Sequence, residues 1–248
     1  MKMKKTLVLF SSLLMLTGIS YTSISANADN INTNQNINVN DHSILNGKRI
    51  AFLGSSITQG LYSGNVSFVD LMSKHDGIIP DKEAVSGTAM AGITNLNYFR
   101  RMQRKIPKNQ HFDAFVTQLS TNDDKIFHFP IGDVSPSYNL NDFNTRTTTG
   151  AIEYIAKYVQ DTWHCPLVFY TCLDKGDAKY GQLVQRLYQL QNKWHFKIID
   201  LYNNKDLNNE MYKPFSYNMA NNIHPTLKGY KLLTPYFEDE LSNVLNGK

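Results

Sequence analysis

The apolar residues of this 248-residue chain change their spacing along the sequence, and from Gly47 onward two spacings alternate. Short continuous apolar runs such as 49–53 are typical of central strands in a parallel sheet, which are buried on both faces. Between these runs, apolar residues recur at helical intervals, as at Ile152, Ile155 and Val159. The predicted strands lie at 49–53, 83–85, 112–119, 166–172 and 197–201, and the predicted helices at 67–75, 95–105, 149–163, 181–194 and 226–245. This alternation predicts an α/β fold with a mostly parallel sheet that helices cover on both faces.

The N-terminus has the pattern of an export signal. Three lysines lie within the first five residues, a mostly apolar run covers 6–19, and Ala-Asn-Ala at 26–28 has the small-x-small pattern of a cleavage site. A transmembrane anchor is the alternative, but the run is short for a bilayer and contains Ser11 and Thr17. We therefore expect residues 1–28 to be a signal peptide. The product is then secreted or associated with the cell surface, with no stable membrane insertion after cleavage.

The segment that follows is rich in asparagine. Residues 29–46 are too polar to bury a face, which predicts a disordered leader, with a β-prone edge segment as the alternative. The folded domain is then expected over 47–248. Without the three lysines of the signal peptide, the 25 basic residues of the chain fall to 22 against 21 acidic ones, a net charge of +1. Because so small a charge leaves no electrostatic footprint for nucleic acid, we expect no nucleic-acid partner.

The two cysteines, Cys165 and Cys172, flank a predicted strand. An extended segment of that length holds its ends roughly 20 Å apart, whereas a disulfide needs Cα atoms within about 7 Å. The spacing therefore predicts two free and mostly buried thiols.

Candidate chemistry follows the first three predicted strands. Ser56 comes after the first strand, Gly87 after the second and Asn122 after the third, and ligands of open parallel sheets bind at this carboxyl edge. Ser56 lies between Gly54 and Gly60, where the backbone can expose its hydroxyl as a nucleophile; a turn serine or a helix N-cap is the alternative. The N–H of Gly87 and the amide of Asn122 could stabilise an oxyanion, although a turn glycine and an Asx-turn asparagine would have the same sequence.

A serine hydroxyl is a weak nucleophile at neutral pH and needs an adjacent base. His224 has a suitable side chain, because the pKa of a histidine can lie near the working pH. Pro225 biases the backbone of His224 toward extended or turn geometry, and Thr226 can cap the helix that follows. A surface-loop histidine is the alternative. The other six histidines lack comparable surroundings in the sequence, and no role is assigned to them.

Four motifs in order give the chain a resemblance to the SGNH hydrolases, a branch of the GDSL esterase/lipase superfamily. Gly54-Ser55-Ser56-Ile57-Thr58 is similar to the first block, with Ser56 at the nucleophile, and Gly87 stands at the glycine of the second. Ser120-Thr121-Asn122-Asp123 is similar to the third block, with Asn122 at the oxyanion asparagine. Asn221-Asn222-Ile223-His224-Pro225 is similar to the last block, Asp-x-x-His-Pro.

The resemblance covers about residues 47–245. It implies a flavodoxin-like, three-layer α/β/α fold. It also implies ester hydrolysis through a covalent acyl-enzyme, with no cofactor and no metal. Carried over residue by residue, it makes Ser56, Gly87 and Asn122 the oxyanion hole and gives position 221 the task of orienting His224.

The chain departs from the family pattern at three positions. Ser55 replaces the Asp of the first block, where we expect little effect, and Ser120 replaces the Gly of the third, which requires a negative φ. Asn221 stands where the family has the Asp that orients the base. A neutral amide can fix the imidazole tautomer only if its oxygen faces the ring; in serine proteases the Asp-to-Asn change costs about 10⁴ in kcat. We expect a working Ser56–His224 dyad, with Asn221 or a backbone carbonyl as a neutral orienter.

The combined expectation is a secreted serine carboxylester hydrolase for short acyl groups, such as an acetyl group on a small-molecule ester or an extracellular glycan. Tyr212, Tyr217 and Tyr230 lie near the base in the sequence and could stack on sugars. Three alternatives stay open. They are an O-acyltransferase to sugar hydroxyls, a degenerate glycan-binding member in which Asn221 has replaced the Asp, and a structural or adhesive protein suggested by the Asn-rich leader.

Overall fold

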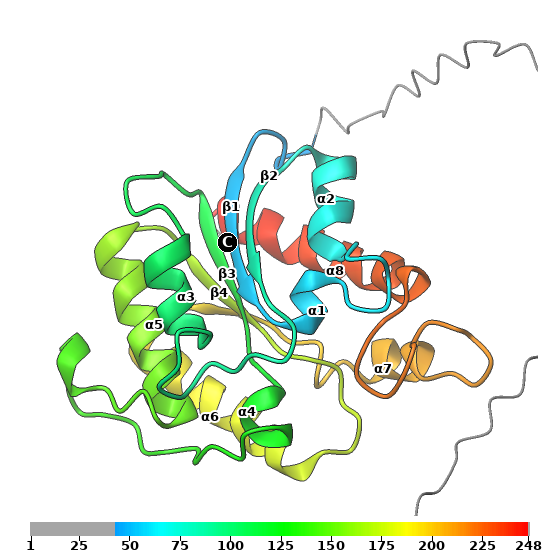
Figure 1. The fold of residues 1–248 in the computed structure, drawn as a ribbon. Helices are drawn as coiled ribbons and strands as arrows, with labels where there is room; N and C mark the ends of the chain where they lie inside the picture. The colour runs from blue at the N-terminus through cyan, green and yellow to red at the C-terminus, as the bar shows by residue number, and fades with distance from the viewer. Residues whose placement is uncertain (1–42, 248) are drawn as a thin grey trace, which may run out of the picture. The chain divides into compact units, whose positions relative to one another are not determined.

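Parallel strands form the centre of the fold. The computed structural model describes residues 43–247, and within them five strands pair in the order β2-β1-β3-β4-β5 (Figure 1). This is the flavodoxin-like order of a doubly wound sheet, so the predicted α/β fold is confirmed. The strands are β1 (Arg49–Gly54), β2 (Ile79–Ala84), β3 (Ala114–Gln118), β4 (Leu167–Tyr170) and β5 (Lys197–Ile199).

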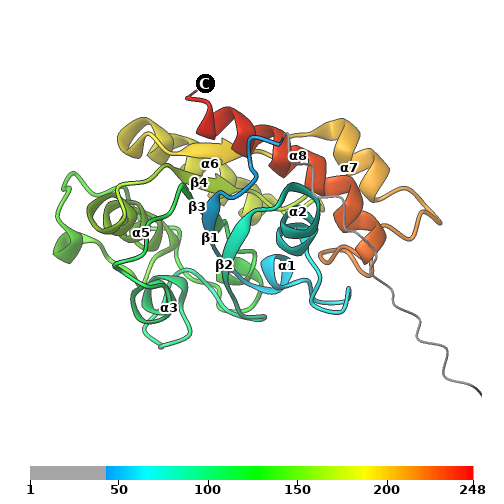
Figure 2. The same cartoon turned by 90° about the horizontal axis from the view of Figure 1, so that it is seen from above.

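Helices cover both faces of this sheet. They are α1 (Ser56–Gln59), α2 (Phe68–Asp76), α3 (Tyr98–Lys105), α4 (Asn122–Lys125), α5 (Thr148–Thr162), α6 (Ala178–Trp194), α7 (Lys205–Met211) and α8 (Leu227–Leu245), with a 3₁₀ turn η1 (Leu140–Asp142). One layer holds α3, α5 and α6, and the other holds α1, α2 and α8 (Figure 2). The result is the three-layer arrangement that the resemblance implies.

Aromatic side chains join the α2–α8 layer to the sheet. Phe68 of α2 stacks on Phe237 of α8 with 3.7 Å between ring centroids, and both rings meet Tyr170 of β4 edge-on. These side chains are almost fully buried, so they anchor the helices that flank the site described below. Both cysteines are free, as predicted: Cys172 is buried and Cys165 is half-buried.

The edge strand β2 begins earlier than the sequence pattern predicts. It starts at Ile79 rather than at residue 83, and its residues are exposed or half-buried. Strand β2 lies at the edge of the sheet beside β1, where Pro80 is tolerated. Its polar sequence therefore lacks the continuous apolar run that identifies central strands. The helices α4 and α7 are not predicted either, because each is too short to show an apolar stripe.

The folded region also begins earlier than expected. Leu45 is fully buried, and residues 44–47 form a turn, so the last part of the expected 29–46 leader belongs to the domain. The expected signal peptide and most of the leader lie outside the described residues. None of the helices within 43–247 has the length and apolar character needed to cross a membrane.

Candidate active site

A buried polar network holds Ser56 at the carboxyl end of β1. Ser56 is the first residue of α1 and is 6% exposed. The side-chain oxygen of Gln118, at the end of β3, accepts hydrogen bonds from the Ser55 N–H at 2.9 Å and the Ser55 hydroxyl at 3.2 Å. The same oxygen accepts from the Thr58 hydroxyl at 3.0 Å. Because Ser55, Thr58 and Gln118 are all fully buried, the turn that carries Ser56 is fixed to the sheet.

This turn leaves no room for a side chain at Gly54. A Cβ there would lie 1.7 Å from the Thr58 hydroxyl oxygen, which is itself 2.6 Å from the Tyr170 hydroxyl. The guanidinium of buried Arg101 donates to the Gly54 carbonyl at 2.6 Å. Ser55 is thus an integral part of the network beneath Ser56. It stands in place of the family's Asp, a replacement for which we expect little effect.

His224 lies next to Ser56, although 168 positions separate them in the sequence. Nε2 of His224 is 2.8 Å from Oγ of Ser56. His224 ends a tight loop before α8, closed by the Ala220 N–H, which donates to the His224 carbonyl at 2.9 Å. The structure therefore brings together the two residues that the sequence suggests as nucleophile and base.

Asn221 contacts the other ring nitrogen of His224. Its Oδ1 accepts hydrogen bonds from the backbone N–H groups of Ile223 and His224, each at 2.9 Å, and lies 3.1 Å from His224 Nδ1. Since both backbone groups are donors, the side-chain atom facing them and the ring is assigned as the amide oxygen. Nδ1 then carries the proton, and Nε2 is free to accept the hydrogen of the Ser56 hydroxyl. This is the amide orientation that a neutral orienter requires.

The surroundings of His224 favour the neutral imidazole. Burial holds the pKa of His224 below its usual value of 6.5, and the positive charge of Lys175 lowers it further. Asn221 supplies no negative charge to oppose these effects. The exposed ring of Tyr62 lies beside the imidazole, with 5.3 Å between ring centroids. At neutral pH the imidazole of His224 is therefore uncharged.

The two further oxyanion candidates are Gly87, on the loop after β2, and Asn122, the first residue of α4, and a hydrogen bond joins these two segments. Gly87 is exposed and has a φ of +74°, a conformation that favours glycine. The Asn122 side-chain amide donates to the carbonyl of Thr88 at 2.8 Å, which leaves one amide hydrogen for a ligand. Ser120, which stands in place of the family's Gly, does not have a positive φ, so a serine fits there without strain. Its hydroxyl accepts a hydrogen bond from the Asn122 N–H at 3.1 Å.

Asp123, to which the sequence motifs assign no role, fixes the loop that follows β2. Its fully buried carboxylate accepts from the N–H groups of Met90 at 2.7 Å and Ala91 at 2.9 Å, and from the Thr148 hydroxyl at 3.1 Å. Burial raises the pKa of Asp123 to about 6, although these hydrogen bonds act in the opposite direction. Its position directly after Asn122 in the third motif is the sequence signal that could have indicated this role.

The three tyrosines expected near the base have different surroundings. Tyr230 is fully buried and its hydroxyl donates to the Ile57 carbonyl at 2.8 Å, so the expectation that it could stack on a sugar is wrong. Tyr217 is 76% exposed. Tyr212 is half-buried and donates to the Asn222 carbonyl at 3.2 Å. Of the three, Tyr217 has the most freedom to meet a ligand.

No family model and no curated protein matches the chain, but solved structures do. A protein from Lactobacillus plantarum superposes with a TM-score of 0.64 at 18% identity, over 80% of this chain and 98% of that one. A protein from Bacteroides ovatus assigned as a GDSL-like lipase gives 0.56 at 14% identity, over 79% and 98%. An acetylxylan esterase from Geobacillus stearothermophilus gives 0.56 at 14% identity, over 80% and 96%. The chain therefore has the fold of GDSL-like lipases and esterases, as its resemblance to the SGNH hydrolases implies.

Proposed function

We propose that this chain is a secreted serine carboxylester hydrolase that cleaves short acyl esters through a covalent acyl-enzyme. The observation that carries the proposal is a line of contacts. Ser56 Oγ lies 2.8 Å from His224 Nε2, and His224 Nδ1 lies 3.1 Å from Asn221 Oδ1. Such a reaction needs a nucleophile, a base in the correct tautomer and a group that orients the base. The fold supports this reading, and the basic and apolar N-terminus supports export.

The reaction uses His224 as both base and acid. In the first step Nε2 takes the hydroxyl proton as Ser56 Oγ attacks the ester carbonyl carbon, while N–H donors of Ser56, Gly87 and Asn122 stabilise the negative oxygen. The bond to the alcohol then breaks, and the alcohol leaves with the proton held by His224. Water repeats the sequence on the acyl-enzyme, which releases the acid and restores the Ser56 hydroxyl.

Asn221 makes the reaction slower than an aspartate would, without disabling it. Its oxygen keeps the proton on Nδ1, so His224 has the productive tautomer, unlike the proteases in which an Asp-to-Asn change holds the wrong one. The amide carries no charge to stabilise the imidazolium that forms as Ser56 attacks. A slow hydrolase therefore agrees better with this geometry than a glycan-binding protein without activity, because the dyad is intact.

An acetyl group on a glycan is the substrate class that we propose. The acetylxylan esterase among the solved structures shares the fold. Two exposed aromatic side chains support a sugar ligand, since flat ring faces suit sugar rings. Tyr62 lies beside the His224 ring, and the Tyr217 carbonyl accepts from the hydroxyl of Thr226, two residues after His224, at 2.7 Å.

Hydrolysis of p-nitrophenyl esters of increasing chain length tests the reaction and the acyl preference together. We expect acetate to be cleaved faster than octanoate, and Ser56→Ala to abolish both activities. Acetylated xylo-oligosaccharide, incubated with an unacetylated oligosaccharide acceptor, then tests the alcohol. Release of free acetate supports the hydrolase, whereas acetyl transfer to the acceptor would identify an O-acyltransferase. Binding of the oligosaccharide without turnover of any ester would contradict the proposal.

A further inference from the structure

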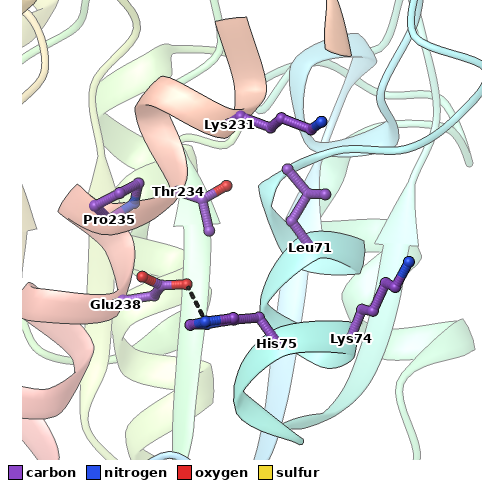
Figure 3. Close-up of a pocket in the computed structure, with 7 residues that line it drawn as sticks. All are labelled: Leu71, Lys74, His75, Lys231, Thr234, Pro235 and Glu238. Atoms are coloured by element: carbon purple, nitrogen blue, oxygen red, sulfur yellow. Dashed lines mark ion pairs between the residues drawn. The ribbon is translucent and has the colours of Figure 1, made fainter. Parts of the chain in front are cut away.

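A second group of side chains with metal-ligating chemistry lies at the end of α2. His75 and Asp76 belong to the last turn of this helix, and Glu238 approaches them from α8. His75 Nδ1 is 3.3 Å from Asp76 Oδ1 and 3.4 Å from Glu238 Oε1, and one ligand atom from each residue lies within 4.8 Å of the others. Figure 3 shows His75 and Glu238 facing each other across the pocket between the two helices.

Asp76 is unusually placed for a carboxylate. It is 4% exposed, and no hydrogen-bond donor among residues 43–247 reaches its Oδ2. It also sits at the C-terminus of α2, where the helix carbonyls present partial negative charge. A buried carboxylate in such a place is strongly unfavourable unless a positive group compensates for it. This buried oxygen therefore needs either a shared proton or a cationic partner.

Glu238 adds a second carboxyl group to the same place. It lies within hydrogen-bonding reach of Asp76. Lys74 and Lys231 line the same pocket, but Figure 3 shows their ammonium groups turned away from the His75–Glu238 pair. Two carboxylates and a helix C-terminus thus face one imidazole. Either a shared proton or a bound cation must balance the excess charge.

The spacing favours a cation of a particular kind. Zn²⁺ binds nitrogen and oxygen ligands at roughly 2.0–2.2 Å in a tetrahedron, which places neighbouring ligand atoms about 3.3–3.6 Å apart. The two distances from His75 Nδ1, 3.3 and 3.4 Å, match this separation. One imidazole and two carboxylates form a three-ligand set that leaves a fourth position for water. Mg²⁺ and Ca²⁺ prefer all-oxygen ligand sets, whereas the imidazole nitrogen of His75 suits a transition-metal ion.

We propose that His75, Asp76 and Glu238 form a binding site for a divalent transition-metal ion of the zinc type. The ion joins the C-terminus of α2 to the middle of α8 and balances the charge of the buried Asp76 carboxylate. The side chain of His75 is 62% exposed, so the ion reaches the site from solvent. The inference goes beyond the proposed hydrolase, because none of its ligands contributes to the Ser56–His224 contact and it does not depend on ester cleavage.

Titration calorimetry with ZnCl₂ on tag-free, chelator-treated protein tests the site. We expect about one equivalent of Zn²⁺ to bind, and binding to weaken at least about 100-fold in His75→Ala and Glu238→Gln. Asp76→Asn, which keeps the shape of the side chain but removes its charge, should weaken it similarly. Lys74→Ala, in the same helical turn, is the matched control and should bind like the unaltered protein. Zn²⁺ at about 100 times its dissociation constant should raise the Tm by roughly 5 °C or more.

Two outcomes would overturn the proposal. Zinc binding that is unchanged in both His75→Ala and Glu238→Gln would place the ion elsewhere on the chain. Absence of saturable binding, with a Tm that Glu238→Gln raises in the absence of metal, would show that Asp76 and Glu238 share a proton. Ester hydrolysis measured on the same samples separates the two proposals. A chain that binds zinc through these residues but hydrolyses no ester would overturn only the hydrolase. A chain that hydrolyses esters but does not bind zinc would overturn only the metal site.

Discussion

The nucleophile and the base of the proposed active site are held in different ways. Ser56 follows a central strand, and the groups that fix its turn come from distant parts of the chain: Gln118 on β3 and Tyr170 on β4, both buried. His224 stands on a loop whose contacts are local. Its orienter, Asn221, is exposed and lies three residues away.

Because of this difference, substitutions in the two regions should affect stability and activity separately. The network under Ser56 satisfies buried donors inside the core, so its loss should lower the free energy of unfolding. The contacts that orient His224 lie at the surface, where water can replace them at small cost to folding. Changes in the loop should therefore reduce turnover with little change in stability, and changes under the nucleophile should do the reverse.

Removing the reacting groups should have the largest effect on activity. We expect Ser56→Ala and His224→Ala each to lower kcat/KM on an activated acetyl ester by about 10⁴ or more, because nucleophile and base act as a unit. The Tm should stay within about 2 °C, and circular dichroism melting checks this. If the double variant lost about twice as much in log units as either single one, the two side chains would not act together.

Altering the orienter should have an intermediate effect. Asn221→Ala removes the acceptor for Nδ1 and for two backbone N–H groups, and we expect kcat to fall by roughly 100-fold. Asn221→Asp adds the missing negative charge, and kcat should rise roughly tenfold, a gain of about 1.4 kcal/mol in transition-state stabilisation. Steady-state kinetics on the acetyl ester measures both. Asn222→Ala, at the exposed neighbouring position, is the control; equal rates for Asn221→Asp and the unaltered chain would show that the amide does not limit the base.

Disrupting the network under Ser56 should affect stability first. Gln118→Leu leaves the Ser55 N–H and two hydroxyls without their buried acceptor, and we expect it to cost roughly 2–4 kcal/mol of unfolding free energy. That corresponds to a Tm lower by roughly 5–15 °C. Gln185→Leu, on the exposed face of α6, is the control. A melting temperature unchanged by Gln118→Leu would contradict the structural role given to this glutamine.

The smallest expected effect is electrostatic. The positive charge of Lys175 contributes to the low pKa of His224, after burial. Replacing it with Met should let the pKa rise toward 6.5, so the acidic limb of the kcat/KM profile moves to higher pH, by less than about one unit. Lys213→Met, at an exposed position, should leave the profile in place. A shift to lower pH in Lys175→Met would mean that the sign of this interaction is wrong.

Much of this fold can be predicted from the sequence because continuous apolar runs indicate its central strands. The strand β2 is less visible, since an edge strand needs no such run, and its polar residues conceal its start at Ile79. The domain starts before the predicted residue 47 for a similar reason, because Leu45 is a single buried residue among polar ones. Hydrophobic periodicity identifies helices and strands that bury a face, and it misses elements that are short or lie at the edge of the sheet.

The site shows the same division. The order of the motifs is enough to suggest Ser56 and His224, but the direction of the Asn221 amide depends on two backbone N–H groups that only the folded loop presents. Tyr230 is misjudged because nearness in sequence says nothing about which way a helical side chain points. The His75–Glu238 contact lies beyond sequence reasoning altogether, since it depends on how α2 packs against α8.

A fluorophosphonate label followed by peptide mass spectrometry tests most directly whether His224 activates Ser56. We expect Ser56 to be modified in the unaltered protein and not in His224→Ala, with circular dichroism showing that both proteins are folded. Labelling of Ser56 that persists at the same rate without His224, or a label found on another residue, would contradict it.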